Sequence, residues 1–314
     1  MTQMSAFEYI RQGQTPFFRL PSIDRRATPA GFDGVAAVLV GVPYDSGVTY
    51  QPGARFAPYH VRRVSALVQS FHPLRRVDVF SRLRAVDGGN IAVSPFSAGQ
   101  MRERIELEVT AIAEAGAAPV VVGGDHSVTL PILRALAERH GPLAVVHVDA
   151  HLDTSGPEVW GDAHHHGTPI RHALAEGLIE HGQLHQIGIR ATWGTPQDGT
   201  LVLEHEARMY DMDLIARDGV RKLLAQVRSD VGDRPLYLTF DVDAVDPAFA
   251  PGTGTPVPGG LSAREALEVV RGLEGTRLVG MDVVEVAPGL DHADLTCHLA
   301  AHLIYEGLAT LAQR

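Results

Sequence analysis

The chain has 314 residues, 45% hydrophobic and 20% charged, which is the composition of a globular protein with one large core. A formal net charge of −10 and the lack of a dense basic run exclude nucleic acid and anionic membrane surfaces as expected partners. With one cysteine, no signal-peptide pattern and no apolar run near the roughly 18 residues of a membrane span, the sequence predicts a cytoplasmic protein without internal disulfides.

Along the chain, apolar runs of strand length alternate with amphipathic stretches of helix length. Residues 1–33 contain three prolines and little periodicity, which predicts an irregular N-terminal arm. The expected strands are 35–42, 76–80, 85–88, 118–122, 143–149, 184–190, 208–211, 235–241 and 277–286. The expected helices are 59–69, 100–115, 128–139, 169–176, 214–228, 263–271 and 295–311. This alternation predicts an α/β fold with a mostly parallel sheet, formed as one domain over residues 1–314.

The stretch Leu143–Asp153 begins as a buried strand and ends in side chains that bind metals. Successive side chains of an extended strand alternate between its two faces, so Asp149, His151 and Asp153 point the same way. Any one of them alone is equally well explained as a polar residue at a solvent-facing strand end. Three in register favour a metal site, at the carboxyl end of a strand where open α/β sheets place their sites.

Three other expected strands end in residues of the same kind, and parallel strands bring these ends to one edge of a sheet. The residues concerned are His126, Asp241, Asp243 and Glu285. With the three residues of the first strand and without Glu285, these are two imidazoles and four carboxylates, which suit Mn²⁺, with Zn²⁺, Fe²⁺ and Ni²⁺ as alternatives. Six ligands are too many for one ion that keeps an open position, and they fit two ions about 3.5–4 Å apart.

The segment Asp241–Asp246 also starts like the calcium loop of an EF-hand, which requires Gly at its sixth position and Glu at its twelfth. Those positions hold Asp246 and Gly252, so the EF-hand interpretation fails. A lone Asp-x-Asp also occurs in enzymes that use nucleotide sugars, and by itself it decides nothing.

Three ordered segments of the chain resemble the motifs of the ureohydrolase (arginase/agmatinase) superfamily. They are Gly123-Gly124-Asp125-His126-Ser127, Asp149-Ala150-His151-Leu152-Asp153 and Asp241-Val242-Asp243-Ala244-Val245-Asp246-Pro247, supported by the loop 250–256, by Arg190 and by 51–55. The resemblance implies a three-layer α/β/α domain of the arginase-like fold and two Mn²⁺ ions per subunit. It also implies hydrolysis of a guanidino group to urea and an amine, in a homotrimer or homohexamer.

The resemblance also implies a role for each matching residue. One ion would be held by His126, Asp149, Asp153 and Asp241, and the other by His151, Asp149, Asp241 and Asp243, with Asp149 and Asp241 bridging. His166, followed by Gly-Thr-Pro, matches the proton-shuttle histidine, and Glu285 matches the carboxylate that holds the guanidinium. Asp153 is counted with these two as catalytic. His164 and His165 are better explained as a solvated histidine patch.

The substrate is indicated by a departure from the arginine-specific pattern. Those members have Ser, Asn and Asn where this chain has Asp162, His164 and Ser155. The sequence therefore favours agmatine, cleaved to putrescine, with a guanidinobutyrase- or guanidinopropionase-type guanidino acid hydrolase as the alternative. Arginase activity, a deacetylase-like enzyme and a non-catalytic metal-binding protein are less favoured. Trp160 and Asp162 are expected to bind the substrate's far end, beside His166 and Glu285.

Overall fold

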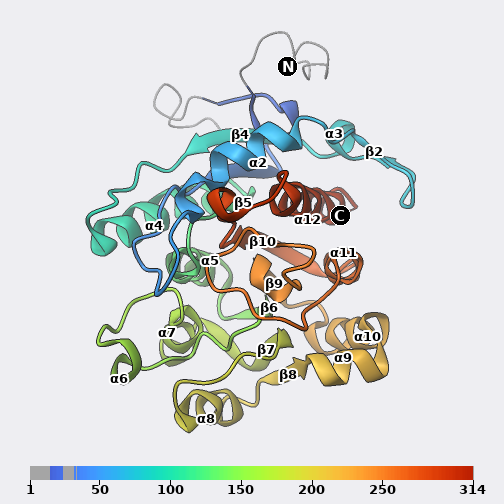
Figure 1. Cartoon of the computed structure of the whole chain (residues 1–314). Coiled ribbons are helices and arrows are strands. Elements are labelled where there is room, and N and C mark those ends of the chain that lie inside the picture. The colour runs from blue at the N-terminus through green and yellow to red at the C-terminus, as the bar shows by residue number, and fades with distance from the viewer. Residues whose placement is uncertain (1–14, 24–31, 33, 314) are drawn as a thin grey trace.

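The computed structural model describes residues 15–23, 32 and 34–313 of the chain, which form a sheet with helices on both sides (Figure 1). Eight strands make up the central sheet, and every pairing between neighbours in it is parallel. Their spatial order is β4 (Ala85–Asn90), β1 (Ala37–Gly41), β5 (Ala118–Val122), β10 (Arg277–Val284), β9 (Pro235–Asp241), β6 (Leu143–Val148), β7 (Ile179–Ile189) and β8 (Arg208–Asp211). A short antiparallel pair, β2 (Phe71–His72) and β3 (Val77–Asp78), lies apart from this sheet.

The helices form two layers, one on each face of the sheet, as Figure 1 shows. One layer contains α4 (Ala98–Glu114), α5 (Thr129–His140) and α7 (Pro169–Ala175). The other contains α2 (Ala57–Ser65), α10 (Val220–Val231), α11 (Ala263–Arg271) and α12 (Leu295–Leu311). The α/β/α fold with a parallel central sheet is therefore confirmed.

Two layers of helices explain why the strands are apolar throughout instead of alternating. In β1, Ala37 and Leu39 belong to the core that contains α2 and α12, whereas Val38 and Val40 belong to the core that contains α4 and α5. Every residue of β1 and of β6 is buried. Burial on both faces is the usual state of a parallel sheet, and it leaves the polar strand ends as the place for chemistry.

The described part of the expected N-terminal arm is packed into the protein. Phe17 and Phe18 begin a single 3₁₀ turn and are completely buried. The ring of Phe18 lies 5.6 Å from that of Phe80, and the guanidinium of Arg62 stacks over Phe17 at 4.0 Å. Residues 1–14, 24–31 and 33, which complete the expected arm, lie outside the described residues.

Several local predictions need correction. The helix expected over 214–228 is two helices, α9 (Met212–Asp218) and α10, because Gly219 between them adopts φ of 80° and ends the first. Helix α8 (Pro196–Glu204) was not expected, although Thr195 and Asp198 form a capping box at its start. The strand expected over 76–80 is only Val77–Asp78, because Asp78 caps a short helix that begins directly after it, α3 (Val79–Arg82). Another short helix, α6 (Pro157–Trp160), was not expected.

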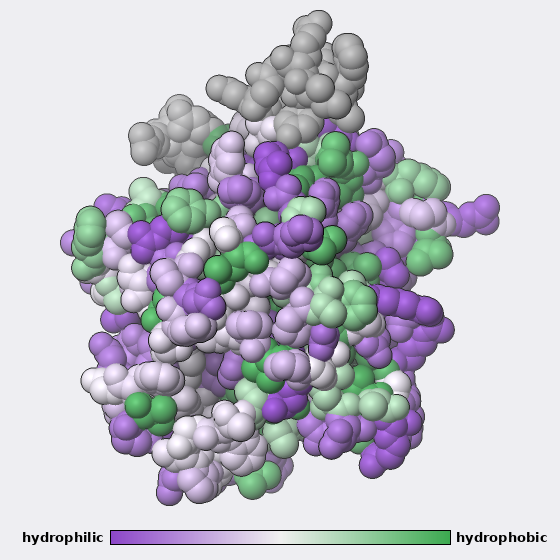
Figure 2. Space-filling model, in the orientation of Figure 1, coloured by the Kyte–Doolittle hydropathy of each residue, from purple (hydrophilic) through white to green (hydrophobic). Residues whose placement is uncertain are grey.

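The outer surface mixes hydrophilic and hydrophobic residues over the face shown in Figure 2. Among the described residues, no helix has the length and apolar character needed to cross a membrane.

Candidate functional site

The four central strands, β5, β10, β9 and β6, are neighbours in the sheet, and all of them end at one rim. His126 follows β5, Asp149 follows β6, Asp241 ends β9 and Glu285 follows β10. The order of the strands therefore brings together residues that are far apart in the chain. The backbone N–H of His126 donates to Glu285 Oε1 at 2.9 Å, across 159 positions of sequence.

The turn after β5 is built so that it can approach its neighbours closely. A Cβ on Gly124 would lie 1.5 Å from the carbonyl oxygen of Tyr44, so glycine is required there. The Gly124 carbonyl accepts from the backbone N–H of Glu285 at 2.9 Å, which joins this turn to the end of β10. Glu285 itself adopts φ of 61° and Asp153 adopts 55°, a left-handed conformation that is costly for these residues and that clusters at functional sites.

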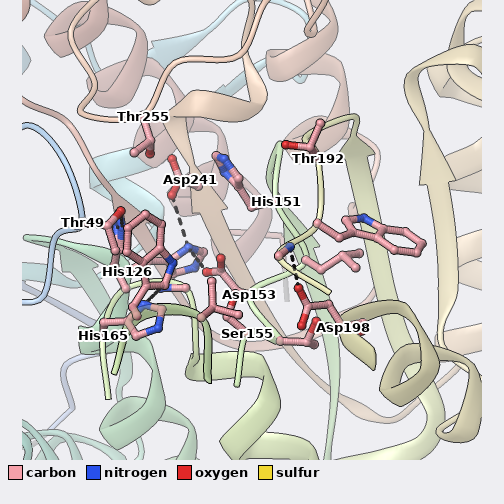
Figure 3. A pocket seen from close by; sticks show the side chains of 18 of the residues that line it. Thr49, His126, His151, Asp153, Ser155, His165, Thr192, Asp198, Asp241 and Thr255 are labelled. Carbon is pink, nitrogen blue, oxygen red and sulfur yellow. Dashed lines mark hydrogen bonds and ion pairs between the residues drawn. The ribbon is translucent and has the colours of Figure 1, made fainter. Parts of the chain in front are cut away.

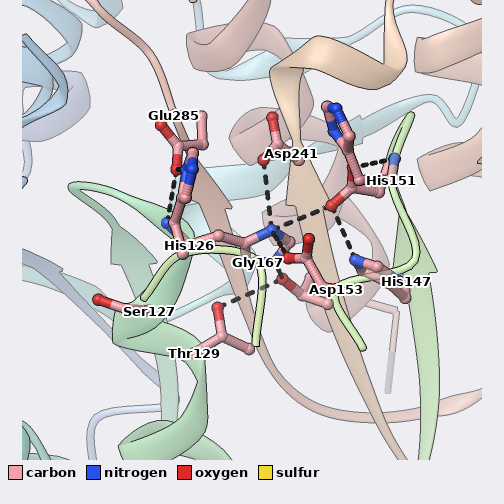
Figure 4. Close-up of polar contacts among 12 residues, drawn as sticks. His126, Ser127, Thr129, His147, His151, Asp153, Gly167, Asp241 and Glu285 are labelled. Atoms are coloured by element: carbon pink, nitrogen blue, oxygen red, sulfur yellow. Dashed lines mark hydrogen bonds and ion pairs between the residues drawn. The ribbon is translucent and has the colours of Figure 1, made fainter. Parts of the chain in front are cut away.

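The first group of candidate metal ligands surrounds one ring nitrogen (Figure 4). His126 Nδ1 lies 3.0 Å from Asp149 Oδ2, 2.9 Å from Asp153 Oδ2 and 3.2 Å from Asp241 Oδ2. All four side chains are buried, yet His126 Nδ1 and Asp153 Oδ2 have no hydrogen-bond partner among the described residues. Buried polar atoms are normally satisfied, and a cation between this nitrogen and the three oxygens would satisfy them.

The second group adjoins the first and shares one residue with it. His151 Nδ1 lies 3.0 Å from Asp243 Oδ2 and 3.4 Å from Asp149 Oδ1, so the two oxygens of Asp149 face different groups. The donors at both positions are imidazole nitrogen and carboxylate oxygen, which suit a divalent ion such as Mn²⁺. The side chains present therefore fit two adjacent cations that share Asp149.

The charges of this buried cluster also call for cations. Burial, followed by the charges of neighbouring aspartates, raises the pKa of Asp241 and of Asp243. Burial alone would lower the pKa of both His126 and His151. The charge of Asp153 nevertheless raises the pKa of His126 well above its usual value, and the charge of Asp243 raises the pKa of His151 to about 12. The acidic groups thus hold positive charge among them, which protons or divalent ions can provide.

His147 lies beside the first group, where it holds Asp149 in place. The side-chain amide of Gln186 donates to Leu152 O at 2.9 Å and contacts His147 Nδ1 at 3.0 Å, which makes Nδ1 the acceptor. His147 Nε2 then carries the proton and donates to Asp149 Oδ2 at 2.8 Å. With one ring nitrogen accepting and the other donating, His147 orients a carboxylate and is not itself free to bind a metal.

Next to the metal groups, His166 and Glu285 form a close pair. His166 Nδ1 lies 2.8 Å from Glu285 Oε1, and His166 Nε2 lies 2.8 Å from Thr49 Oγ1. Burial lowers the pKa of His166, but the charge of Glu285 outweighs it and raises the pKa to about 9. The raised pKa favours a charged His166 ring beside Glu285, whereas the backbone N–H of Thr49, which donates to Nε2 at 3.2 Å, favours a lone pair on that nitrogen.

Sequence reasoning did not single out Thr49, although it lies just before the matched segment 51–55. Its loop is held by Asp125, whose Oδ2 accepts from the backbone N–H of Gly47 at 2.8 Å. The carbonyl of Gly47 in turn accepts from the backbone N–H of His166 at 3.0 Å. Asp125 thus ties this loop to the turn that carries His126.

A cavity of about 490 Å³ opens above these groups. His126, His151, Asp153 and Asp241 lie at one end of the view in Figure 3, and Thr192 and Asp198 lie at the other. The lining residues that were not expected from the sequence include Thr49, Tyr50, Thr192, Asp198 and Thr255, with Ser155 noted there only for its difference from arginases. The two oxygens of Asp198 are engaged in capping α8, since Oδ2 accepts from the backbone of Gly194 at 2.9 Å.

Of the two residues expected at the substrate's far end, Trp160 lines the cavity and Asp162 does not. Trp160 lines the cavity with 58% of its surface exposed, and Trp193 lines it at 47%. Asp162 is exposed and is not among the lining residues, because its Oδ1 accepts from the backbone N–H of His164 at 2.9 Å. His164 stacks on His172, also outside the cavity, whereas His165 is buried and lines it.

The charge of the cavity wall is one-sided. The described residues that line it include four aspartates and four histidines but neither lysine nor arginine. Arg190, which lies close by, is engaged with backbone carbonyls, including that of Asp243 at 2.7 Å and that of Ala244 at 3.0 Å. The wall therefore offers a substrate carboxylate neither a lysine nor an arginine as a partner.

Comparison with known proteins agrees with this geometry. Proclavaminate amidinohydrolase of Streptomyces clavuligerus is 42% identical over 301 residues, covering 94% of each chain, and its solved structure superposes with a TM-score of 0.90 at 41% identity, covering 96% of this chain and 97% of that one. Guanidinopropionase of Pseudomonas aeruginosa is 42% identical, covering 96% of this chain and 92% of the relative. Mitochondrial agmatinase of Gallus gallus is 40% identical, covering 89% and 82%. The sequence profile of the Arginase family matches residues 35–309. The chain therefore belongs to the arginase family, within the ureohydrolase superfamily.

Proposed function

We propose that this protein is a hydrolase that uses two Mn²⁺ ions per chain to cleave a guanidino compound into urea and an amine. One observation carries the proposal: two groups of histidine and aspartate side chains share Asp149, and a histidine–glutamate pair lies directly beside them under the same cavity. Membership of the arginase family supports the same reaction.

The proposed ligands of one ion are His126, Asp149, Asp153 and Asp241, and those of the other are His151, Asp149, Asp241 and Asp243. When bound, such a pair of ions activates water for attack and neutralises charge that develops during the reaction. Around them, Glu285 would hold the planar guanidinium through its two oxygens, and His166 would return a proton to the leaving amine. Asp153, at the cavity floor, would help to fix the attacked carbon near the metals.

In this structure His166 stands between the cavity and Glu285. Glu285 is 1% exposed and is not a lining residue, while His166 lines the cavity and contacts Glu285 at 2.8 Å. A substrate guanidinium and the His166 imidazolium would thus compete for one carboxylate. Binding of a cationic substrate requires His166 either to turn aside or to lose its proton.

This competition predicts that guanidinium binding depends on pH. The pKa of His166 is raised to about 9, so the ring is charged and paired below pH 9 and neutral above it. We expect the inhibition constant of guanidinium ion to fall by up to about tenfold per pH unit between pH 7 and 9, then to level off. In His166→Ala the constant should be low and unchanged over this range. A constant that does not vary with pH in the wild-type protein would contradict the competition.

The proposed substrate is agmatine, because it has a second cation at the end opposite the guanidinium. No lysine or arginine is among the described lining residues, so the wall has neither of these side chains to repel such a tail. The rings of Trp160 and Trp193 at the cavity wall could hold an ammonium group by cation–π attraction. For Asp162, the expected role in substrate binding stays a prediction.

A guanidino acid hydrolase is the second candidate. It is favoured by the relatives, since guanidinopropionase and guanidinobutyrase of Pseudomonas aeruginosa are 42% and 38% identical to this chain, about as similar as the agmatinases. Such a substrate would place its carboxylate among neutral wall residues, where backbone and hydroxyl groups would have to bind it.

Urea release from a panel of substrates tests the proposal. The Mn²⁺-loaded protein is given agmatine, 4-guanidinobutyrate, 3-guanidinopropionate and arginine, and kcat/KM is measured for each. We expect the highest value for agmatine and the lowest for arginine. A preference for a guanidino acid would support the proposed reaction but contradict agmatine as the substrate. If none of the four compounds released urea, the proposed reaction itself would be contradicted.

A homotrimeric or homohexameric assembly in the cytoplasm stays a prediction, which light scattering and cell fractionation would test.

A further inference from the structure

Thr49, in the loop that follows β1, presents two hydrogen-bonding groups to one ring nitrogen of His166. Its backbone N–H donates to His166 Nε2 at 3.2 Å, and its hydroxyl Oγ1 lies 2.8 Å from the same nitrogen. A backbone N–H can only donate, so the neutral ring has a lone pair on Nε2 and its proton on Nδ1, which donates to Glu285 Oε1 at 2.8 Å. Thr49 and Glu285 thus hold the imidazole through its two nitrogens.

The hydroxyl of Thr49 can bond to this ring in both of its charge states. It donates to Nε2 when the ring is neutral, and it can accept from Nε2–H when the ring is protonated, whereas the backbone N–H suits only the neutral ring. The contact between Thr49 Oγ1 and His166 is therefore available at any pH at which His166 is paired with Glu285.

The loop that carries Thr49 is fixed by side chains other than His166. Buried Asp45 closes the loop, since its Oδ2 accepts from the backbone N–H of Gly53 at 2.8 Å. Buried Asp125 holds the loop from the turn after β5, through the backbone N–H of Gly47 at 2.8 Å. The two groups of Thr49 are thus set in place before they meet the ring, which is the condition for positioning another side chain.

The position of His166 decides whether Glu285 can be reached. Glu285 is buried and does not line the cavity, whereas Thr49 and His166 both line it. A guanidinium that binds both oxygens of Glu285 displaces the ring from Oε1, and a ring that turns away also loses its bonds to Thr49. The bond to the Thr49 hydroxyl therefore opposes the opening of the site, and a hydrogen bond of this kind typically changes an equilibrium constant by about 3- to 10-fold.

We infer that Thr49 is a positioning residue for His166: its hydroxyl holds the imidazole on Glu285 and thereby lowers the affinity of this site for guanidinium. The inference rests on the proposed function, because that function assigns Glu285 to the guanidinium. It gives Thr49 an effect opposite to that of a residue that binds the substrate, since removing such a residue weakens binding.

Guanidinium binding by variants of the Mn²⁺-loaded protein tests this. Thr49→Val removes the hydroxyl at nearly constant volume and keeps the backbone N–H, and Thr49→Ser keeps both groups. Thr192→Val is the matched control, because Thr192 lines the same cavity at the end away from His126 in Figure 3. The dissociation constant of guanidinium ion is measured by calorimetry at constant pH, and folding is followed by the Tm of each variant.

We expect Thr49→Val to lower the dissociation constant of guanidinium by about 3- to 10-fold, and Thr49→Ser and Thr192→Val to stay within about twofold of the wild-type value. In the His166→Ala protein the constant should be low, and adding Thr49→Val should not lower it further, because the two residues act as one unit. An unchanged or raised constant in a folded Thr49→Val protein would overturn the inference. An equal fall in the His166→Ala background would overturn it as well.

Modification of His166 by diethyl pyrocarbonate separates this inference from the proposed function. The reagent is attacked by the lone pair of a ring nitrogen, and Thr49 engages the lone pair of Nε2. Thr49→Val should raise the rate at which His166 is modified, read by peptide mass spectrometry, by about 3- to 10-fold whether or not Glu285 binds guanidinium. An unchanged rate would contradict the hold of Thr49 on the ring. Wild-type affinity for guanidinium in Glu285→Gln would instead overturn the proposed role of Glu285.

Discussion

Replacing Asp149 with asparagine is expected to remove both Mn²⁺ ions and to lower kcat/KM by about 10³-fold or more, because a metal supplies several kcal/mol of transition-state stabilisation. Asp149 is the residue shared by the two candidate groups, and each of its oxygens faces a different histidine. The amide of asparagine can keep the hydrogen bond from the backbone N–H of His151 but loses the negative charge and one donor oxygen. Metal content by elemental analysis and urea release are the two measurements.

The chain offers a matched control for this variant. Asp198 lines the cavity beside the metal groups and is buried like Asp149, at 3% exposure against 0%, but its oxygens cap α8 and belong to neither metal group. Asp198→Asn should keep two Mn²⁺ ions per chain, with at most a lower Tm from the weakened cap. An Asp149→Asn protein that retains both ions and full turnover would show that the two groups do not form a shared metal site.

Glu285→Gln is expected to raise KM and lower kcat, with a combined loss in kcat/KM of about 10²-fold or more, while the metal content stays unchanged. Removing one partner of a buried charged pair typically costs about 2–5 kcal/mol, and about 1.4 kcal/mol corresponds to a factor of ten. Glu285 is buried and contacts His166 and the backbone of His126, but it belongs to neither metal group. Steady-state kinetics with the preferred guanidino substrate, together with elemental analysis, measure the effect.

The same variant separates two roles for Glu285. If it binds the guanidinium, the loss in kcat/KM should be accompanied by a weaker inhibition by guanidinium ion at pH 9, where about half of His166 is uncharged. Loss of Mn²⁺ in Glu285→Gln would mean that the residue supports the metal centre through its bond to the His126 backbone instead. An unchanged inhibition constant for guanidinium would exclude it as the binding carboxylate.

The sequence predicted that the candidate ligands lie at the ends of parallel strands, and the sheet brings these ends to one rim. Period-two alternation does not describe Asp149, His151 and Asp153, because β6 ends at Val148 and Asp153 adopts φ of 55°. What the pattern left open was the order of the strands. The sheet places β10 and β9 between β5 and β6, and that order decides that His126, Asp149, Asp241 and Glu285 meet.

Residues that reach the site from loops could not be found in this way. Thr49 contacts His166 only because Asp125 anchors its loop across 78 positions of sequence, and no local periodicity encodes that contact. The shielding of Glu285 by His166 is likewise a tertiary arrangement.

The most direct test of the account is a titration of the metal-free protein with Mn²⁺, in which urea release is measured at each addition. The account predicts that activity is absent without metal, rises with added Mn²⁺ and reaches a plateau at two ions per chain. Full turnover in the metal-free protein, or a plateau at one ion, would contradict the pair of sites that share Asp149.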